Sequence, residues 1–395
     1  MKLSFRWTPR RVLVAVVLLG ALLRAWAALL LPTDFDEPIY LQAAYDYAQA
    51  LKAGNLNGVI DYPENREHPA LVKLLYGGVV LALDGYDHWT NALYASRALS
   101  AAFGTLGVLL VALAGGPLAG GMLAVHTLAV KYTSQAYLEA LPHFASVAAV
   151  LALQRSGSPR DRWFWLSALA LGLAAAGKLT YLPVLIVLLY LTTWEKNFQW
   201  RSMVPYLIAA GALFWLLNPT LWHDPFSRLS DALVFHVRYS QSAPIQQTGY
   251  PWYQPLVWVA TSAASSWHPE VFFYFGFDGI IFLLALGGLP REWRERRWLV
   301  VWMVSGILFL LLWPTKWPQY ALVVIPALCL AAAESARQLY TWLSELEAYW
   351  EWLPQMLLRP PVYAWVVLGG FVTFITVVYL AGAVQLAAGR VGWSH

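Results

Sequence analysis

Long apolar blocks separated by short polar connections are the feature that most constrains this chain. Each block is long enough to cross, or nearly cross, a lipid bilayer as a helix. Charged residues make up 12% of the 395 residues and hydrophobic residues 59%, whereas a soluble domain carries about 25% charged residues. The pattern predicts an all-α polytopic membrane protein with one integral membrane domain over residues 1–395, and it excludes an ordinary soluble enzyme. Eleven spans are expected, approximately over residues 11–31, 97–114, 117–134, 138–153, 163–177, 178–193, 203–218, 271–289, 298–313, 318–333 and 361–387.

Basic residues indicate how these spans are oriented. With the N-terminus inside and the C-terminus outside, the basic residues of the short loops fall on the cytoplasmic side, as the positive-inside rule requires. They are Arg155, Arg160, Arg162, Lys196, Arg201, Arg291, Arg294, Arg296, Arg297, Arg337 and Arg359. Because this charge is scattered between apolar blocks, nucleic acid is not expected as a partner.

Two long segments, 32–96 and 219–268, then lie outside. Counting the apolar stretch 69–83 as a span would invert every later loop, so we place it on the outer surface, where segment 32–96 would also carry amphipathic juxtamembrane helices. Alternating apolar and acidic residues over 336–357 predict an interfacial helix on the cytoplasmic face. For Arg24, inside the first span, we favour snorkelling to the far interface over contact with an anionic lipid head.

Acidic residues point to the outer side as the working face. Nine of the 22 Asp and Glu residues lie in segment 32–96. Asp36-Glu37-Pro38 follows the first span, where Asp36 could be a helix N-cap or a catalytic carboxylate. Glu67-His68 ends the polar part of the same segment.

Further polar residues, among them two lysines, are also predicted on the outer side. Glu139 and His143 are four residues apart and therefore share a helix face. Lys178 and Lys316 lie outside against the positive-inside trend, and an anionic lipid phosphate is their natural partner. A carboxylate can take the proton of an attacking hydroxyl, while a lipid phosphate is a leaving group that needs positive charge nearby. The sequence therefore predicts transfer of a group from a lipid phosphate to an acceptor hydroxyl outside the cytoplasm.

In this order and topology, a set of short motifs resembles the membrane-embedded glycosyltransferases of the GT-C fold, in particular the protein O-mannosyltransferases and the lipid A aminoarabinose transferase. The motifs are Phe35-Asp36-Glu37 with Tyr40, Glu67-His68-Pro69-Ala70-Leu71, Tyr137-Leu138-Glu139, Gly177-Lys178, Trp222-His223-Asp224-Pro225, and Thr315-Lys316-Trp317-Pro318-Gln319-Tyr320 with Pro326.

The resemblance implies a GT-C fold and an inverting transfer of a monosaccharide from a polyprenyl-phosphate sugar to a protein, lipid or glycan hydroxyl. It implies Asp36 as the general base with Glu37 beside it. The implied substrate-binding residues are Glu67, His68, Lys178, Arg238, Tyr239, Lys316 and Tyr320, with Lys316 foremost at the phosphate. A divalent metal ion held by Asp36, Glu139 and His143 stays open, because relatives differ in their need for metal.

Two other classes remain as alternatives. A polyprenyl-phosphate-linked lipid transporter or flippase would place ionisable groups near the bilayer midplane and show repeated halves. A non-catalytic scaffold in contact with membrane lipids would need no outer carboxylates. The expected location is a prokaryotic plasma membrane with the active site facing outward, and the endoplasmic reticulum membrane facing its lumen also fits the topology.

Overall fold

The computed structural model describes residues 9–83, 89–262 and 276–349, and this part of the chain is helical without a strand. The all-α prediction is confirmed there. The helices are α1 (Pro9–Leu30), α2 (Asp36–Lys52), α3 (Leu56–Ile60), α4 (Leu71–Ala82), α5 (Trp89–Val125), α6 (Thr127–Tyr132), α7 (Ala140–Arg155), α8 (Arg162–Gly177), η2 (Leu179–Tyr181), α9 (Val184–Tyr190), η3 (Leu191–Glu195), η4 (Trp200–Ser202), α10 (Met203–Leu216), η5 (Pro219–Leu221), α11 (Pro225–Ser240), α12 (Ala243–Thr248), α13 (Gln254–Ala260), α14 (Asp278–Glu295), α15 (Arg297–Leu312), η7 (Pro318–Val323) and α16 (Ile325–Tyr349).

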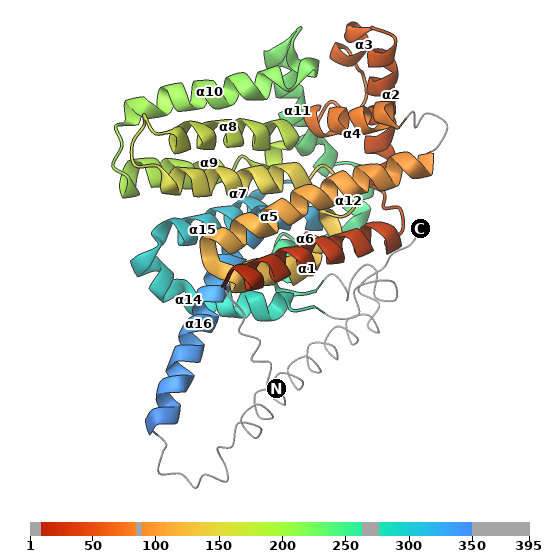
Figure 1. The fold of residues 1–395 in the computed structure, drawn as a ribbon. Helices are drawn as coiled ribbons and strands as arrows, with labels where there is room; N and C mark the ends of the chain where they lie inside the picture. The colour runs from red at the N-terminus through yellow and green to blue at the C-terminus, as the bar shows by residue number, and fades with distance from the viewer. Residues whose placement is uncertain (1–8, 84–88, 263–275, 350–395) are drawn as a thin grey trace.

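The long helices lie side by side as a bundle (Figure 1). Helix α1 packs along α5, α7 along α8, and α14 along α16. Helices α2, α3 and α4 cover the end at the right of Figure 1, where α2 packs on α4. The first predicted outer segment therefore forms a helical cap over one end of the bundle.

Helix α5 is broken where two spans were predicted to meet. At Gly116 the backbone adopts φ 81° and ψ 171°, a conformation that favours glycine, and Pro117 follows without an N–H to continue the helix. The chain turns back closely, since a Cβ on Gly120 would lie 2.4 Å from Cβ of Ala112. The predicted spans 97–114 and 117–134 thus correspond to the two arms of a hairpin.

The number of spans stays a prediction. Within the described ranges, two helices, α1 and α5, are both long and apolar enough to cross a membrane. Other helices agree closely with predicted spans, among them α8 with 163–177 and α15 with 298–313, but each of these two has 16 residues, fewer than the roughly 20 that usually cross a bilayer. The predicted span 361–387 lies outside the described residues, as does the end of the predicted interfacial helix 336–357, which begins as an unbroken continuation of α16.

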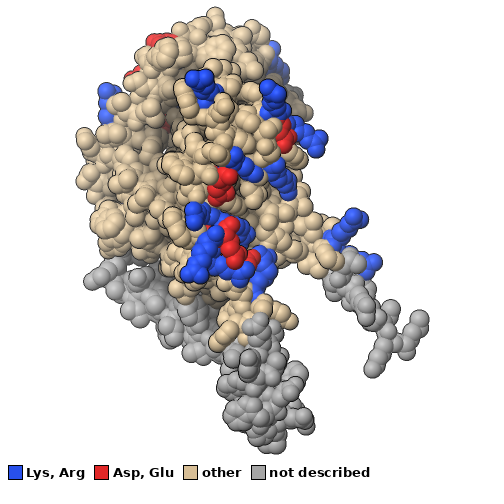
Figure 2. All heavy atoms as spheres, turned by 90° about the vertical axis from the view of Figure 1, so that its left-hand side faces the viewer, with Lys and Arg blue, Asp and Glu red and all other residues tan. Residues whose placement is uncertain are grey.

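Basic side chains gather on the end of the bundle opposite the α2–α4 cap. Figure 2 views the left-hand end of Figure 1, where Lys and Arg outnumber Asp and Glu. Ion pairs link the end of α14 to α16 there: Glu334 of α16 lies 3.5 Å from Arg296 and 3.7 Å from Arg291. The predicted orientation, with these basic residues on the cytoplasmic side, stays a prediction.

The prediction for Arg24 is wrong. Its side chain is fully buried between α1, α5 and α6 instead of reaching an interface. Its Nε donates to Thr133 Oγ1 at 2.8 Å, and its other nitrogens donate to backbone carbonyls of Gly20, Leu123 and Ala124. The carbonyls of Leu123 and Ala124 are available because α5 ends at Val125, and the last carbonyls of a helix have no partner within it.

Candidate active site

The connection between α1 and α2 is fixed by a buried ion pair. Glu37 Oε1 accepts from Arg97 Nε at 2.7 Å and from the Ala136 N–H at 2.6 Å. Glu37 Oε2 accepts from Arg97 Nη2 at 2.5 Å and from the Asp34 N–H at 2.9 Å. Arg97 also donates to the carbonyls of Ala28, Leu31 and Pro32 at the end of α1.

This pair corrects the expectation that Glu37 works beside Asp36 as a catalytic carboxylate. Glu37 is fully buried, and both of its oxygens accept hydrogen bonds from α5 and from the backbone. A carboxylate held in this way anchors the start of α2 and is not available to a substrate. Its neighbour Asp36 is thereby fixed in position.

Asp36 is the first residue of α2 and is half-buried. No side chain caps this helix, so the alternative of Asp36 as N-cap is wrong. Tyr40, one turn on, donates its hydroxyl to Asp36 Oδ2 at 3.4 Å. Burial raises the pKa of Asp36 to about 6, while the Lys178 ammonium acts to lower it. A carboxylate that titrates near neutral pH suits a general base.

Aromatic rings surround Asp36. Tyr40 contacts Tyr137 edge-on with ring centroids 6.1 Å apart, and Tyr137 contacts Tyr132 at 5.2 Å. On its other side Tyr40 meets the His68 ring at 5.8 Å. These rings come from α2, α6, the α6–α7 connection and the loop before α4, so the site is built where four segments meet.

The loop that carries Glu67 and His68 is held by a buried lysine. Lys73 Nζ donates to the backbone carbonyls of Asn65 and His68 at 2.7 and 3.1 Å, and to Asn65 Oδ1 at 2.9 Å. Burial lowers the pKa of Lys73 to about 7. Glu67 accepts from the Asn65 amide at 2.7 Å. The loop is therefore tied to α4 through one ammonium group.

His68 faces a second histidine across the site. The ring of His236, from α11, lies 5.8 Å from that of His68 and 5.1 Å from that of Trp313 at the end of α15. His236 is 4% exposed. Burial lowers the pKa of both histidines, that of His236 to about 4.

Lys178 lies at the centre of these groups. Its ammonium pairs with Glu139 and lies 5.3 Å from the ring centroid of Tyr320. After burial, it is the largest electrostatic influence on the pKa values of Asp36, His68 and His236. Tyr239 belongs to the same neighbourhood, because the charges of Asp36 and Glu67 raise its pKa in addition to burial.

The structure thus brings together most of the substrate-binding residues expected from sequence. Two of them are elsewhere. Arg238 is exposed on α11, and Lys316 Nζ donates to the carbonyls of Leu310, Leu311 and Trp313 at the end of α15. Lys316 therefore neutralises a helix C-terminus instead of facing the site.

Asp36, Glu139 and His143 do not form a metal site. Glu139 is paired with Lys178, and His143 Nδ1 lies 3.2 Å from the carbonyl oxygen of Leu322, to which its ring turns. In the described ranges no group of three His, Cys, Asp or Glu side chains is arranged to hold a metal ion. Asp36, Glu139 and His143 therefore do not fit the divalent metal ion that the resemblance left as a possibility.

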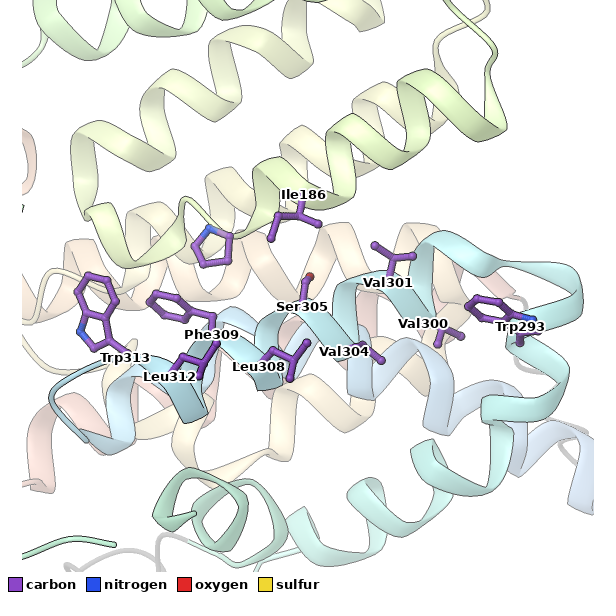
Figure 3. Close-up of a pocket in the computed structure, with 11 residues that line it drawn as sticks. Ile186, Trp293, Val300, Val301, Val304, Ser305, Leu308, Phe309, Leu312 and Trp313 are labelled. Carbon is purple, nitrogen blue, oxygen red and sulfur yellow. The ribbon is translucent and has the colours of Figure 1, made fainter. Parts of the chain in front are cut away.

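An apolar groove begins beside His236. It has a volume of about 630 Å³ and lies between α9 and α15, as Figure 3 shows. Trp313 lies at one end and Trp293 at the other, with Ile186 opposite Val301 and Ser305 along its length. Exposed side chains such as Leu308 and Leu312 line it. Trp313 belongs to the groove and also contacts His236, so the groove ends at the polar site.

Sequence reasoning missed some residues of the site. Arg97 was taken only as the start of a span, although an arginine at the edge of an apolar block is a signal for a buried partner. Lys73 and the loop it holds were also missed, as was Lys131, whose ammonium pairs with Asp34 at 3.0 Å. His236 lies in the predicted outer segment 219–268, but nothing in the sequence pairs it with His68.

Two solved structures share most of this architecture. Both are of ArnT from Cupriavidus metallidurans, one bound to undecaprenyl phosphate and one in the apo state, with TM-scores of 0.55 and 0.57 and identities of 18% and 16%. The fold is that of the GT-C glycosyltransferases. Each match covers 85% of this chain and 62% of the ArnT chain, so this chain spans less than two thirds of ArnT.

A weaker likeness, with a TM-score of 0.40, is to the Pmt1-Pmt2 protein O-mannosyltransferase complex of S. cerevisiae bound to the sugar donor, at 18% identity over 60% of this chain and 34% of that one. Comparison of sequences finds neither a matching family model nor a matching curated protein. At these identities the likeness to ArnT establishes the fold, and the predicted GT-C architecture is confirmed at that level.

Proposed function

We propose that this protein is an inverting glycosyltransferase of the membrane, which moves a monosaccharide from a polyprenyl-phosphate sugar to an acceptor hydroxyl on the outer side of the membrane. The observation that carries the proposal is the continuous arrangement of an apolar groove, a polar centre and one carboxylate. The groove suits a polyprenyl chain, because it is apolar and open at the side of the bundle. The ArnT structure bound to undecaprenyl phosphate supports a lipid phosphate as the ligand class.

In the proposed reaction, Asp36 accepts the proton of the acceptor hydroxyl as its oxygen attacks the anomeric carbon of the sugar. The bond from that carbon to the phosphate oxygen breaks, and its electron pair stays on the phosphate. A single displacement of this kind inverts the sugar carbon, since no carboxylate forms a covalent intermediate. Glu139 is paired with Lys178 and Glu37 with Arg97, which leaves Asp36 as the carboxylate best suited to be the base.

Other residues then have supporting roles. The tyrosines around Asp36 would form the walls against which the sugar packs. Lys178 would contribute positive charge, partly balanced by Glu139, near the breaking bond. Glu67, Tyr239 and Tyr320 would complete the binding site. No step depends on a metal ion.

The test is donor cleavage by the purified protein in lipid. Labelled polyprenyl-phosphate mannose, glucose and aminoarabinose are each supplied with cell extract as acceptor, beside the Asp36→Asn variant. We expect one donor to yield free lipid phosphate and a labelled acceptor with the wild type and not with the variant. Tight donor binding without sugar transfer would favour the flippase, and no dependence on any lipid phosphate would favour a scaffold.

A further inference from the structure

The loop over residues 61–70 is tied at its start to helix α11. Arg228, near the beginning of α11, donates through Nη2 to Asp61 Oδ1 at 2.7 Å and through Nη1 to the carbonyl of Ile60 at 2.6 Å. His223 Nδ1 lies 3.0 Å from the same Asp61 oxygen. Arg228 and Asp61 are 167 residues apart in the sequence, so these contacts join the two long outer segments of the chain.

The end of the same loop is tied to the end of α10 by Asn218, whose side chain is fully buried. Its Oδ1 accepts from the Ala70 N–H at 2.7 Å, and its Nδ2 donates to the carbonyl of Phe214 at 2.6 Å. A side-chain amide can accept and donate at once, and the backbone groups at helix ends need such partners because their own helix supplies none. Loss of this side chain would take a hydrogen bond from two backbone groups.

The contacts that are shielded from water determine the strength of these ties. The Asp61 side chain is 48% exposed, and an ion pair of an exposed carboxylate contributes little to stability. The Arg228 side chain is 17% exposed and donates to the carbonyl of Thr220 as well as to that of Ile60. Hydrogen bonds from a charged donor are stronger than those between neutral groups. We therefore expect Arg228 and Asn218 to hold the loop, with a smaller contribution from Asp61.

The tied loop forms one wall of the candidate active site. It carries Glu67 and His68, and the His68 ring lies 5.8 Å from the ring of Tyr40, which donates its hydroxyl to Asp36. The same His68 ring lies 5.8 Å from the ring of His236 on α11. A shift of the loop relative to α11 would therefore move Glu67 and His68 with respect to the carboxylate that is the proposed base.

We propose that Asn218 and Arg228 are positioning residues for the sugar transfer. By tying both ends of loop 61–70 to the connection between α10 and α11, they hold Glu67 and His68 at the distance from Asp36 that the reaction needs. Two ties at opposite ends fix both the position and the direction of the loop, which one tie could not do. A misplacement of about 1 Å can lower a rate about 10²-fold, so loss of either tie should be visible in the kinetics. This inference rests on the proposed function.

The first experiment measures donor cleavage by Asn218→Ala and Arg228→Ala in the full chain in lipid nanodiscs. The donor is whichever of labelled polyprenyl-phosphate mannose, glucose and aminoarabinose the wild type cleaves, with cell extract as acceptor. Arg294→Ala is the matched control, because Arg294 is an exposed arginine near the end of α14. Thermal unfolding checks that each variant folds. If Asn218→Ala does not fold, Arg228→Ala carries the test.

In both site variants we expect the apparent KM for the donor to rise about tenfold while kcat stays within about twofold of the wild type, and we expect no change in the control. A merely structural role would give the opposite division. Partial unfolding reduces the amount of active protein, so it would lower the apparent kcat and leave KM unchanged.

A reversible tether tests whether the tie itself sets KM. The variant Asp61→Cys/His223→Cys/Arg228→Ala removes the contacts at the start of the loop and places two thiols where exposed side chains meet. A short bis-methanethiosulfonate reagent joins them. The one native cysteine, Cys329, is buried and should not react. We expect a raised KM before tethering, a return toward the wild-type KM after it, and reversal by a reductant.

Amide hydrogen exchange of peptides that span residues 61–71 gives a readout that does not depend on activity. We expect faster exchange in Asn218→Ala and Arg228→Ala than in the wild type and the control, and slower exchange once the tether is in place. A KM within about twofold of the wild type in both site variants, or a tether that leaves KM raised, would overturn the inference. If the wild type cleaves no donor while exchange changes as expected, the proposed function is wrong and the tie between the outer segments stands.

Discussion

Replacement of Glu37 by Gln separates an anchoring role from a catalytic one. The carboxylate accepts four hydrogen bonds, two from Arg97 and one each from the Asp34 and Ala136 N–H groups. A glutamine keeps one carbonyl oxygen as acceptor and turns an NH₂ group toward N–H donors. Arg97 would remain buried, 1% exposed, with no carboxylate partner.

The expected cost is large. Removal of one partner from a buried ion pair destabilises a protein by about 3–5 kcal/mol, because the remaining charge is uncompensated. We expect Glu37→Gln to lower the free energy of unfolding by about this amount and to reduce turnover along with it. The double variant Glu37→Gln/Arg97→Gln should be less destabilised than the sum of the single variants, since it leaves no buried charge.

The assay is denaturant unfolding in a fixed detergent at constant pH, with donor cleavage measured on the same preparations. Asp36→Asn is the matched control at the neighbouring position. It should lose turnover and keep its stability, because burial already disfavours the charged form of Asp36. A Glu37→Gln protein that unfolds within 1 kcal/mol (roughly a fivefold change in equilibrium constant) of the wild type, yet has lost turnover, would refute the anchoring role.

Three further predictions concern the pKa of Asp36, the hydrogen bonds of Lys316 and the apolar groove. Donor cleavage should fall as the pH decreases through about 6, because the raised pKa of Asp36 means that the base is protonated below that value; a rate profile flat from about pH 5 to pH 8 would contradict this. Lys316→Met should cost about 1–2 kcal/mol of stability through the lost carbonyl contacts and leave the affinity for donor unchanged in a binding assay. Val304→Trp should fill part of the groove and raise KM for long-chain donors more than for short-chain ones, and equal effects on both would argue against the groove as the lipid site.

Helices and their ends were accessible to sequence reasoning, because apolar length and the placement of arginines are local signals. Asp36, His68 and Lys178 were singled out by type and position, and the fold places them in one neighbourhood, while their roles stay a prediction. The partners of the charged side chains could not be predicted in this way. Lys316 and Lys178 look alike in sequence as outer lysines, but Lys316 binds the carbonyls at the end of the preceding helix, α15, and Lys178 pairs with Glu139.

Buried arginines show the same limit. The position of Arg24 inside an apolar block predicts a charge whose burial is unfavourable. From the sequence alone, the simplest way to avoid that burial is for the side chain to extend to the membrane interface. The fold supplies partners instead, the backbone carbonyls of Leu123 and Ala124 at the end of α5, where that helix stops before α6. Such partners are set by tertiary packing over about 100 residues of separation, which no local pattern contains.

The central claim is that a sugar leaves a lipid phosphate with Asp36 as the base. The most direct measurement is a single-turnover time course with labelled donor in proteoliposomes, comparing wild type with Asp36→Asn at the same occupancy of donor, and determining the anomeric configuration of the product. The account predicts transfer with inversion by the wild type and loss of transfer, with donor still bound, in the variant. Transfer by the variant at a near-normal rate, or a product with retained configuration, would contradict it.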